Sequence, residues 1–219
     1  MVFQLTCGFN TIYWKHGDSS AISAACAVAG AITAALESLP PLDIIRISQE
    51  AAFLGRKWGK PSTLPDISEL IEQAYESIKH IPTDDYEGLY LSLNNSVGIK
   101  REACFLVPIA IAIAIHSLDA REAILIATNM GNDADTTASI AGAIAATIHP
   151  ESLPGDWVDA MERKNNHQIS ELGSALIKQR EQLKSNECIL YDKEGIKAHP
   201  NCSDCKGWMR FLYEYESKK

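Results

Sequence analysis

Residues 129–144 read NMGNDADTTASIAGAI, a turn containing a glycine that runs directly into a helix of small residues. Asp133 and Asp135 stand one residue apart, and the hydroxyl of Thr136 follows at once. Because residues two apart do not share a face of a helix, the two carboxylates can converge only in the loop and the first helical turn. Their oxygens and the hydroxyl suit Mg²⁺ or Ca²⁺ better than Zn²⁺. On these residues alone, a capping Asp with a spare acid beside it is the commoner arrangement.

The residues around this motif favour the metal-binding interpretation, because the whole segment resembles the carboxyl-terminal signature of the ADP-ribosylglycohydrolase family. That family includes the dinitrogenase-reductase-activating glycohydrolases and the J1-type crystallins, and its signature reads approximately N-x-G-G-D-x-D-T-x-A-x-x-A-G-A-x-A. The similarity extends to residues 107–110, 121–124 and 153–157, and covers residues 15–163. Asn132 replaces the second glycine, and the matching residues are Asn129, Gly131, Asp133, Asp135, Thr136, Ala138, Ala141, Gly142 and Ala143.

The resemblance implies a hydrolase that removes ADP-ribose, or a similar nucleoside-diphosphate-linked group, from a protein side chain or a small molecule. It implies that metal-bound water attacks the anomeric carbon. Asp133 and Asp135 would be the catalytic acids and, with Thr136, the metal ligands. The cofactor would be Mg²⁺, with two ions in a complete site and Mn²⁺ as an alternative. Three further residues would shape the substrate pocket: Asn129, Gly131 and Asn132.

A second candidate segment is His16-Gly17-Asp18-Ser19-Ser20-Ala21. From the residues alone, a surface loop with an ordinary N-terminal cap is the favoured interpretation. The segment looks like the family's histidine that precedes small polar residues and an alanine-rich helix. The resemblance therefore implies that His16 binds substrate and does not transfer protons.

Two family elements, G-D-x-x-G and T-D-D-T, precede this histidine in relatives, and neither is found before His16 here. We therefore expect the fold to lack the family's amino-terminal helices. Two functions remain open: a hydrolase whose remaining ligands come from a complementary half or partner subunit, and an inactive remnant that binds ADP-ribose or a protein. Residues 83–85, Thr-Asp-Asp, resemble part of T-D-D-T, but after Pro82 a turn and helix cap is favoured.

The periodicity predicts an all-α protein, a compact orthogonal helical bundle of the ADP-ribosylglycohydrolase type spanning residues 1–183. Asp18 should cap the first helix, Asp66 and Glu69 should form a capping box, and Gly55 should cap a helix end. The expected helices cover residues 19–36, 42–54, 67–78, 86–93, 101–116, 119–128, 135–148, 156–163 and 169–183.

The tail, residues 184–219, is expected to be irregular. It contains Cys188, His199, Cys202 and Cys205, which could bind zinc, although loop cysteines without a metal are favoured by their irregular spacing. A net charge of −8 and a pI of about 5.2 argue against a nucleic-acid binder. Residues 103–115 form an uncharged run that is too short to span a membrane, and we expect it to be a buried core helix. We expect a cytoplasmic protein whose partners are ADP-ribosylated proteins or ADP-ribose-like ligands, a complementary subunit or a homo-oligomer, with no nucleic acid or membrane.

Overall fold

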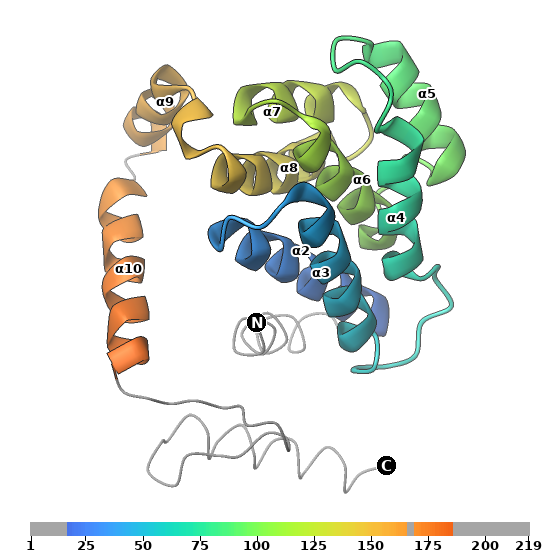
Figure 1. The fold of residues 1–219 in the computed structure, drawn as a ribbon, viewed down its shortest axis with the longest axis horizontal. Helices are drawn as coiled ribbons and strands as arrows, with labels where there is room; N and C mark the ends of the chain where they lie inside the picture. Colours follow the sequence, from blue (N-terminus) through green and yellow to red (C-terminus); the bar gives the residue numbers. More distant parts are fainter. Residues whose placement is uncertain (1–16, 166–168, 186–219) are drawn as a thin grey trace, which may run out of the picture. The chain divides into compact units, whose positions relative to one another are not determined.

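The computed structural model describes residues 17–165 and 169–185, and within these ranges every regular element is a helix and no strand forms. The predicted all-α class is confirmed. Figure 1 shows the helices in chain order: α2 (Ser19–Leu36), α3 (Pro41–Gly55), α4 (Ile67–Ile78), α5 (Tyr86–Ser96), α6 (Ala103–His116), α7 (Ala120–Asn129), α8 (Ala134–Ile148), α9 (Gly155–Asn165) and α10 (Ile169–Ser185), with a 3-10 turn at Pro150–Ser152.

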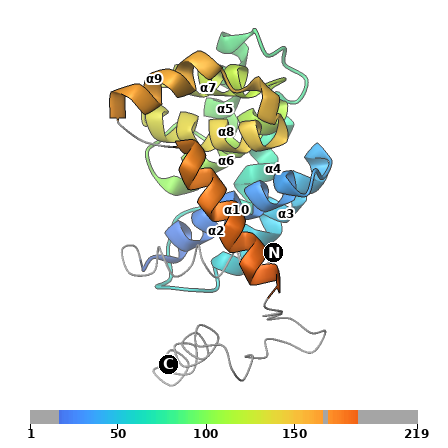
Figure 2. The same cartoon turned by 90° about the vertical axis from the view of Figure 1, so that its left-hand side faces the viewer.

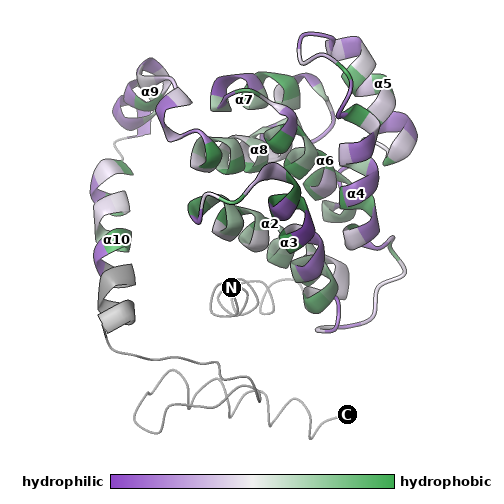
Figure 3. Ribbon diagram, viewed as in Figure 1, coloured by the Kyte–Doolittle hydropathy of each residue, from purple (hydrophilic) through white to green (hydrophobic). Residues whose placement is uncertain are grey.

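The chain divides into two units after Gly155. Helices α2 to α8 belong to the first unit, and two views of it show α8 lying between α7 and α2 (Figures 1 and 2). In the second unit, α9 is largely hydrophilic (Figure 3) and has no buried residue. Helix α10 has several exposed apolar residues: Ile169, Leu172, Leu176 and Ile177. The candidate site residues that the structure describes all belong to the first unit.

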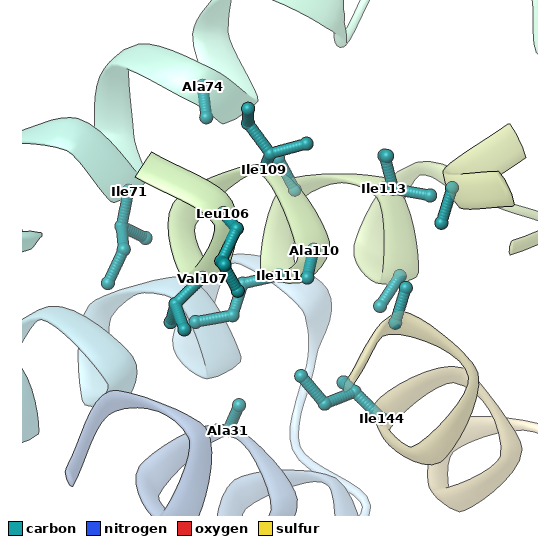
Figure 4. Close-up of a cluster of buried hydrophobic side chains, with 14 of the residues drawn as sticks. Ala31, Ile71, Ala74, Leu106, Val107, Ile109, Ala110, Ile111, Ile113 and Ile144 are labelled. Atoms are coloured by element: carbon teal, nitrogen blue, oxygen red, sulfur yellow. The ribbon is translucent and has the colours of Figure 1, made fainter. Parts of the chain in front are cut away.

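Helix α6 is the centre of the first unit. Every residue from Cys104 to Ala114 is buried, so this helix has no polar face. Figure 4 shows side chains approaching it from three other helices: Ala31 of α2, Ile71 and Ala74 of α4, and Ile144 of α8. A helix that is apolar all round is stable in water only when other helices enclose it. The prediction that this uncharged run forms a buried core helix is therefore confirmed.

Small residues let α2 and α3 pack at very short range. A Cβ atom built on Gly30 of α2 would lie 2.8 Å from the Cβ atom of Ala51 in α3. A Cβ atom on Gly55 would lie 2.8 Å from the Sγ atom of Cys26. The prediction that Gly55 caps a helix end is wrong: it is the last helical residue, and Arg56 follows in a right-handed conformation. Gly55 is required because it leaves room for α2.

Helix α2 is long and apolar enough, by length and composition alone, to cross a membrane. However, 61% of it is buried inside the bundle, as is usual for a core helix. Its alanines contact the neighbouring helices, and Ala27 and Ala31 are completely buried. The hydropathy of α2 is therefore explained by packing within the first unit.

The predicted capping residues define several helix starts. The Asp18 side chain accepts hydrogen bonds from the amides of Ser20 and Ala21, and Asp66 accepts one from the amide of Ser68. Asp85 accepts a hydrogen bond from the Gly88 amide at 2.9 Å, so the turn-and-cap interpretation of residues 83–85 is confirmed. Helix α5 runs to Ser96, beyond its predicted end at residue 93, and both Leu93 and the following Val97 are buried.

We expect Gly30→Ala to lower the free energy of unfolding by about 1–3 kcal/mol, because the new methyl group would be forced against Ala51. This loss should appear even though alanine is a better helix former than glycine by about 1 kcal/mol. Urea unfolding followed by circular dichroism measures it. Gly173→Ala is the control, since a Cβ there meets no atom within 4 Å. A Gly30→Ala protein as stable as the parent would contradict the close α2–α3 contact.

Candidate metal and substrate site

Asp133 and Asp135 lie at the start of α8, Asp133 as the residue before the helix and Asp135 in its first turn. This is the placement that allows two acids one residue apart to converge. Thr136 contacts both of them: its hydroxyl donates to Asp133 Oδ1 at 3.0 Å, and its amide donates to Asp135 Oδ1 at 3.0 Å. Asp133 makes no side-chain capping bond to the backbone of α8. Its carboxylate is therefore directed to Thr136 and does not serve as an ordinary helix cap.

The two carboxyl groups also interact with each other. A hydrogen bond with Asp133, helped by the Thr136 amide, holds the pKa of Asp135 below its usual range. Asp135 is exposed, whereas Asp133 and Thr136 are partly buried. Two acids within hydrogen-bonding reach repel when both are ionised, and a divalent cation relieves that repulsion. The structure thus brings together all three residues that the sequence proposed as metal ligands.

The loop before α8 needs two consecutive residues with positive φ. Gly131 has φ of +73° and Asn132 has φ of +54°. Asparagine is among the few residues other than glycine that adopt this conformation readily, which explains how Asn132 can replace the family's second glycine. The Asn132 side chain also donates to the carbonyl of Ile99 at 2.6 Å. A Cβ on Gly131 would meet no atom within 4 Å, so this loop faces open space.

The remaining predicted substrate residues are only partly placed. Asn129 ends α7, is exposed, and donates from its side chain to the Leu125 carbonyl at 2.8 Å. His16 lies outside the described residues, as do Cys188, His199, Cys202 and Cys205. The segment that follows His16 is held firmly: the Gly17 carbonyl accepts from the Lys60 amide at 2.6 Å, and the Ser19 amide donates to the Lys60 carbonyl at 2.9 Å.

The starts of α2 and α6 lie close together, as the environment of the Cys104 thiol shows. Burial raises the pKa of Cys104, and Glu102 adds to this, while the Ser20 hydroxyl and the Lys100 ammonium act in the opposite direction. Ser20 is buried, and its hydroxyl has no well-aligned hydrogen-bond partner within the described residues, so the thiol is a weak partner for it. Asn132 ties the start of α8 to the same region through Ile99. The three helices therefore begin at one end of the bundle.

Sequence reasoning missed the segment Gly98–Glu102, which the structure places next to the loop before α8. Ile99 and Asn132 are 33 positions apart, and no local pattern indicates their hydrogen bond. Within residues 17–165 and 169–185, no group of three or more His, Cys, Asp or Glu side chains could hold a metal ion. The oxygen atoms at the start of α8 that could ligate a metal are those of the acid pair and the Thr136 hydroxyl.

A family model described as ADP-ribosylglycohydrolase matches residues 11–186 of the 219-residue chain. The chain belongs to the ADP-ribosylglycohydrolase family. The comparisons with curated proteins and with solved structures gave no match. Membership suggests a hydrolase activity of the ADP-ribosylglycohydrolase kind, and the match includes every residue proposed for the site.

In this ADP-ribosylglycohydrolase family member, Asn132 contributes both a backbone conformation and a hydrogen bond, and two substitutions separate them. Asn132→Gly keeps the positive φ and should lower the free energy of unfolding by about 1 kcal/mol, the value of one hydrogen bond. Asn132→Ala loses both and should cost about 1 kcal/mol more, because alanine resists the left-handed conformation. Urea unfolding measures the difference. Equal stability of the two variants would show that the backbone conformation is not a constraint.

The acid pair of this family member predicts a pH dependence. The Asp135 pKa is lowered in the folded state, so the ionised form stabilises the fold above the usual Asp range. This contribution disappears as the pH falls through the lowered value. Carbon NMR titration of the side-chain carboxyl groups should show Asp135 titrating below the usual range, and Asp133→Ala should raise its pKa. Asp84→Ala, outside the site, should leave it unchanged. If the pKa of Asp135 were the same in the Asp133→Ala protein as in the parent, the two carboxyl groups would not interact.

Proposed function

We propose that this protein is a Mg²⁺-dependent hydrolase that cleaves the glycosidic bond joining ADP-ribose to a protein side chain or a small molecule. The observation that supports this most directly is the double contact of Thr136, which holds Asp133 and Asp135 at the start of one helix. If the acid pair served only to cap α8, the Asp133 carboxylate would accept a hydrogen bond from a backbone amide of the helix. It accepts none.

The donor atoms fit Mg²⁺. Oxygen ligands at 2.0–2.1 Å in an octahedron lie about 3 Å apart along an edge. Asp133 Oδ1 and Thr136 Oγ1 are separated by 3.0 Å. Asp135 is exposed, which leaves space for the water molecules that Mg²⁺ usually keeps. Asp133, Asp135 and Thr136 would therefore hold the ion, and Mn²⁺ has the same donor preference. Once bound, the metal would make water more acidic and neutralise negative charge that develops during cleavage.

The residues of the chain would then act on water and substrate. The oxygen of the attacking water forms a bond to the anomeric carbon as the glycosidic C–N or C–O bond breaks. One carboxylate of the acid pair takes a proton from that water and passes it to the departing nitrogen or oxygen, so the carboxylate returns to its ionised form. The open loop at Gly131 and Asn132, with Asn129 and His16, would position the ribose and the phosphates. The products are free ADP-ribose and the unmodified side chain or small molecule.

A second candidate function is a binding module for ADP-ribose or a protein without catalysis. It is favoured by the small donor set, since no larger cluster of His, Cys, Asp or Glu accompanies the acid pair within the described ranges. In the hydrolase interpretation, further ligands would come from water, from a complementary subunit or from another copy of the chain. A module that binds ADP-ribose would share its ligand with the hydrolase and differ only in that no bond is broken, whereas a module that binds a protein would differ in its ligand as well.

Two measurements on the same proteins test the proposal. Calorimetric titration with Mg²⁺ should give binding heat for the parent and no heat for Asp135→Asn, because one of the few ligands is lost. Incubation with ADP-ribosylated arginine or serine peptides should release ADP-ribose, and Asp133→Asn should slow release by about a hundredfold or more. Asp84→Asn removes an exposed acid elsewhere and is the matched control for both measurements.

The outcomes separate the two functions. Identical Mg²⁺ heats in the parent and in Asp135→Asn would remove the metal site. ADP-ribose binding by the parent without release from any peptide, alone or with a supplied partner subunit, would leave the binding module as the function. Release that is unaffected by Asp133→Asn would place the chemistry outside the acid pair.

A further inference from the structure

The segment Gly98–Glu102, which leads into α6, lies beside the proposed site and is fixed on both of its sides. The Ile99 carbonyl accepts the Asn132 side chain at 2.6 Å, and the Ile99 amide donates to the Asn94 side chain at 3.3 Å. Gly98 has φ of +88°, a turn that glycine makes without strain. Lys100 therefore follows a residue whose backbone is tied directly to the loop before α8.

The ammonium group of Lys100 is positioned by an aromatic ring. Its Nζ atom lies 4.2 Å from the centroid of the Phe105 ring, and Phe105 is only 8% exposed. A cation over the face of a buried ring is attracted to it while its other side stays open to solvent. Lys100 makes no salt bridge within the described residues, whereas several other basic side chains do. Its charge is therefore localised near the first turn of α6, and no acid of the described residues forms a salt bridge with it.

The positive charge of Lys100 would reduce the repulsion that an anionic substrate meets at the acid pair. The site contains two carboxylates, and the whole chain carries a net charge of −8. The diphosphate of ADP-ribose is also anionic, so it would be repelled unless a cation lay close to the acid pair. Lys100 and the exposed Arg101 are the basic residues of the two segments joined by the Asn132–Ile99 hydrogen bond, residues 98–102 and 129–137. Glu102 offsets part of this charge and is itself exposed.

We propose that Lys100 binds a phosphate of the substrate's diphosphate and thereby makes the site selective for sugars linked to nucleoside diphosphates. The inference rests on the proposed function, because it assigns Lys100 to the same substrate. Its role is specificity: Lys100 strengthens binding of a diphosphate-bearing ligand and takes no part in breaking the glycosidic bond. A neutral ligand with the same adenosine group gains nothing from it.

Calorimetry with ADP-ribose and with adenosine, in the presence of Mg²⁺, tests the assignment on the full chain. Lys100→Glu should weaken ADP-ribose binding by about tenfold or more, the effect of losing one charge-assisted hydrogen bond and reversing its charge. Lys100→Met keeps the apolar part of the side chain over Phe105 and should weaken binding in the same direction. The effect should shrink as salt is added. Adenosine binding should be unchanged in both variants.

Lys57→Glu is the matched control. Lys57 also holds its ammonium over an aromatic ring, 4.5 Å from the centroid of Phe53, and its substitution changes the net charge equally. It should leave ADP-ribose affinity unchanged. Equal losses in Lys57→Glu and Lys100→Glu would reduce the effect to overall charge and overturn the inference, as would unaltered binding by both Lys100 variants. A parent protein that binds no ADP-ribose would overturn the proposed function itself, so the two failures are distinguishable.

Discussion

The complete burial of α6 is the constraint on which the first unit depends. Because this helix has no polar face, α2, α4 and α8 must cover it, and each supplies small or branched apolar side chains for that purpose. Ile144 lies near the later part of α6, and Asn132 bonds Ile99 in the segment that leads into the start of α6. Helices α6 and α8 therefore run in the same direction, with α7 as the antiparallel connection. The hydrophobic requirement of one helix thus determines where the acid pair at the start of α8 is presented.

Few contacts hold the acid pair of the site. Asp133 and Asp135 are held by Thr136, but neither is paired with a basic side chain in the described residues. The positive end of the α8 dipole favours them only modestly, since the effect is small at exposed positions. Such an arrangement keeps negative charge available for a ligand. A salt bridge at the same place would stabilise the acids and make them less able to bind a cation.

The sequence was sufficient for the elements and for the acid motif, and insufficient for contacts between segments. Capping residues such as Asp18 and Asp66 predicted helix starts because their bonds are local. Spacing alone indicated that Asp133 and Asp135 can converge only in the loop and the first helical turn. The role of Gly55 could not be read in the same way, because a glycine at a helix end fits both a cap and a close contact, and only the position of Cys26 distinguishes them. The Asn132–Ile99 bond and the environment of Lys100 depend on tertiary packing and leave no local signal.

The loop after α3 is bound to the start of α2 through both backbone and side chain. Lys60 exchanges hydrogen bonds with Gly17 and Ser19, and the Ser62 amide donates to the Ser19 hydroxyl at 3.1 Å. A glycine is needed at position 59, where the two segments meet, because a Cβ there would lie 2.7 Å from the Gly17 carbonyl oxygen. Amides at 19, 60 and 62 should therefore exchange with solvent deuterium as slowly as those of the enclosing helices. This irregular stretch would open only when the bundle unfolds cooperatively.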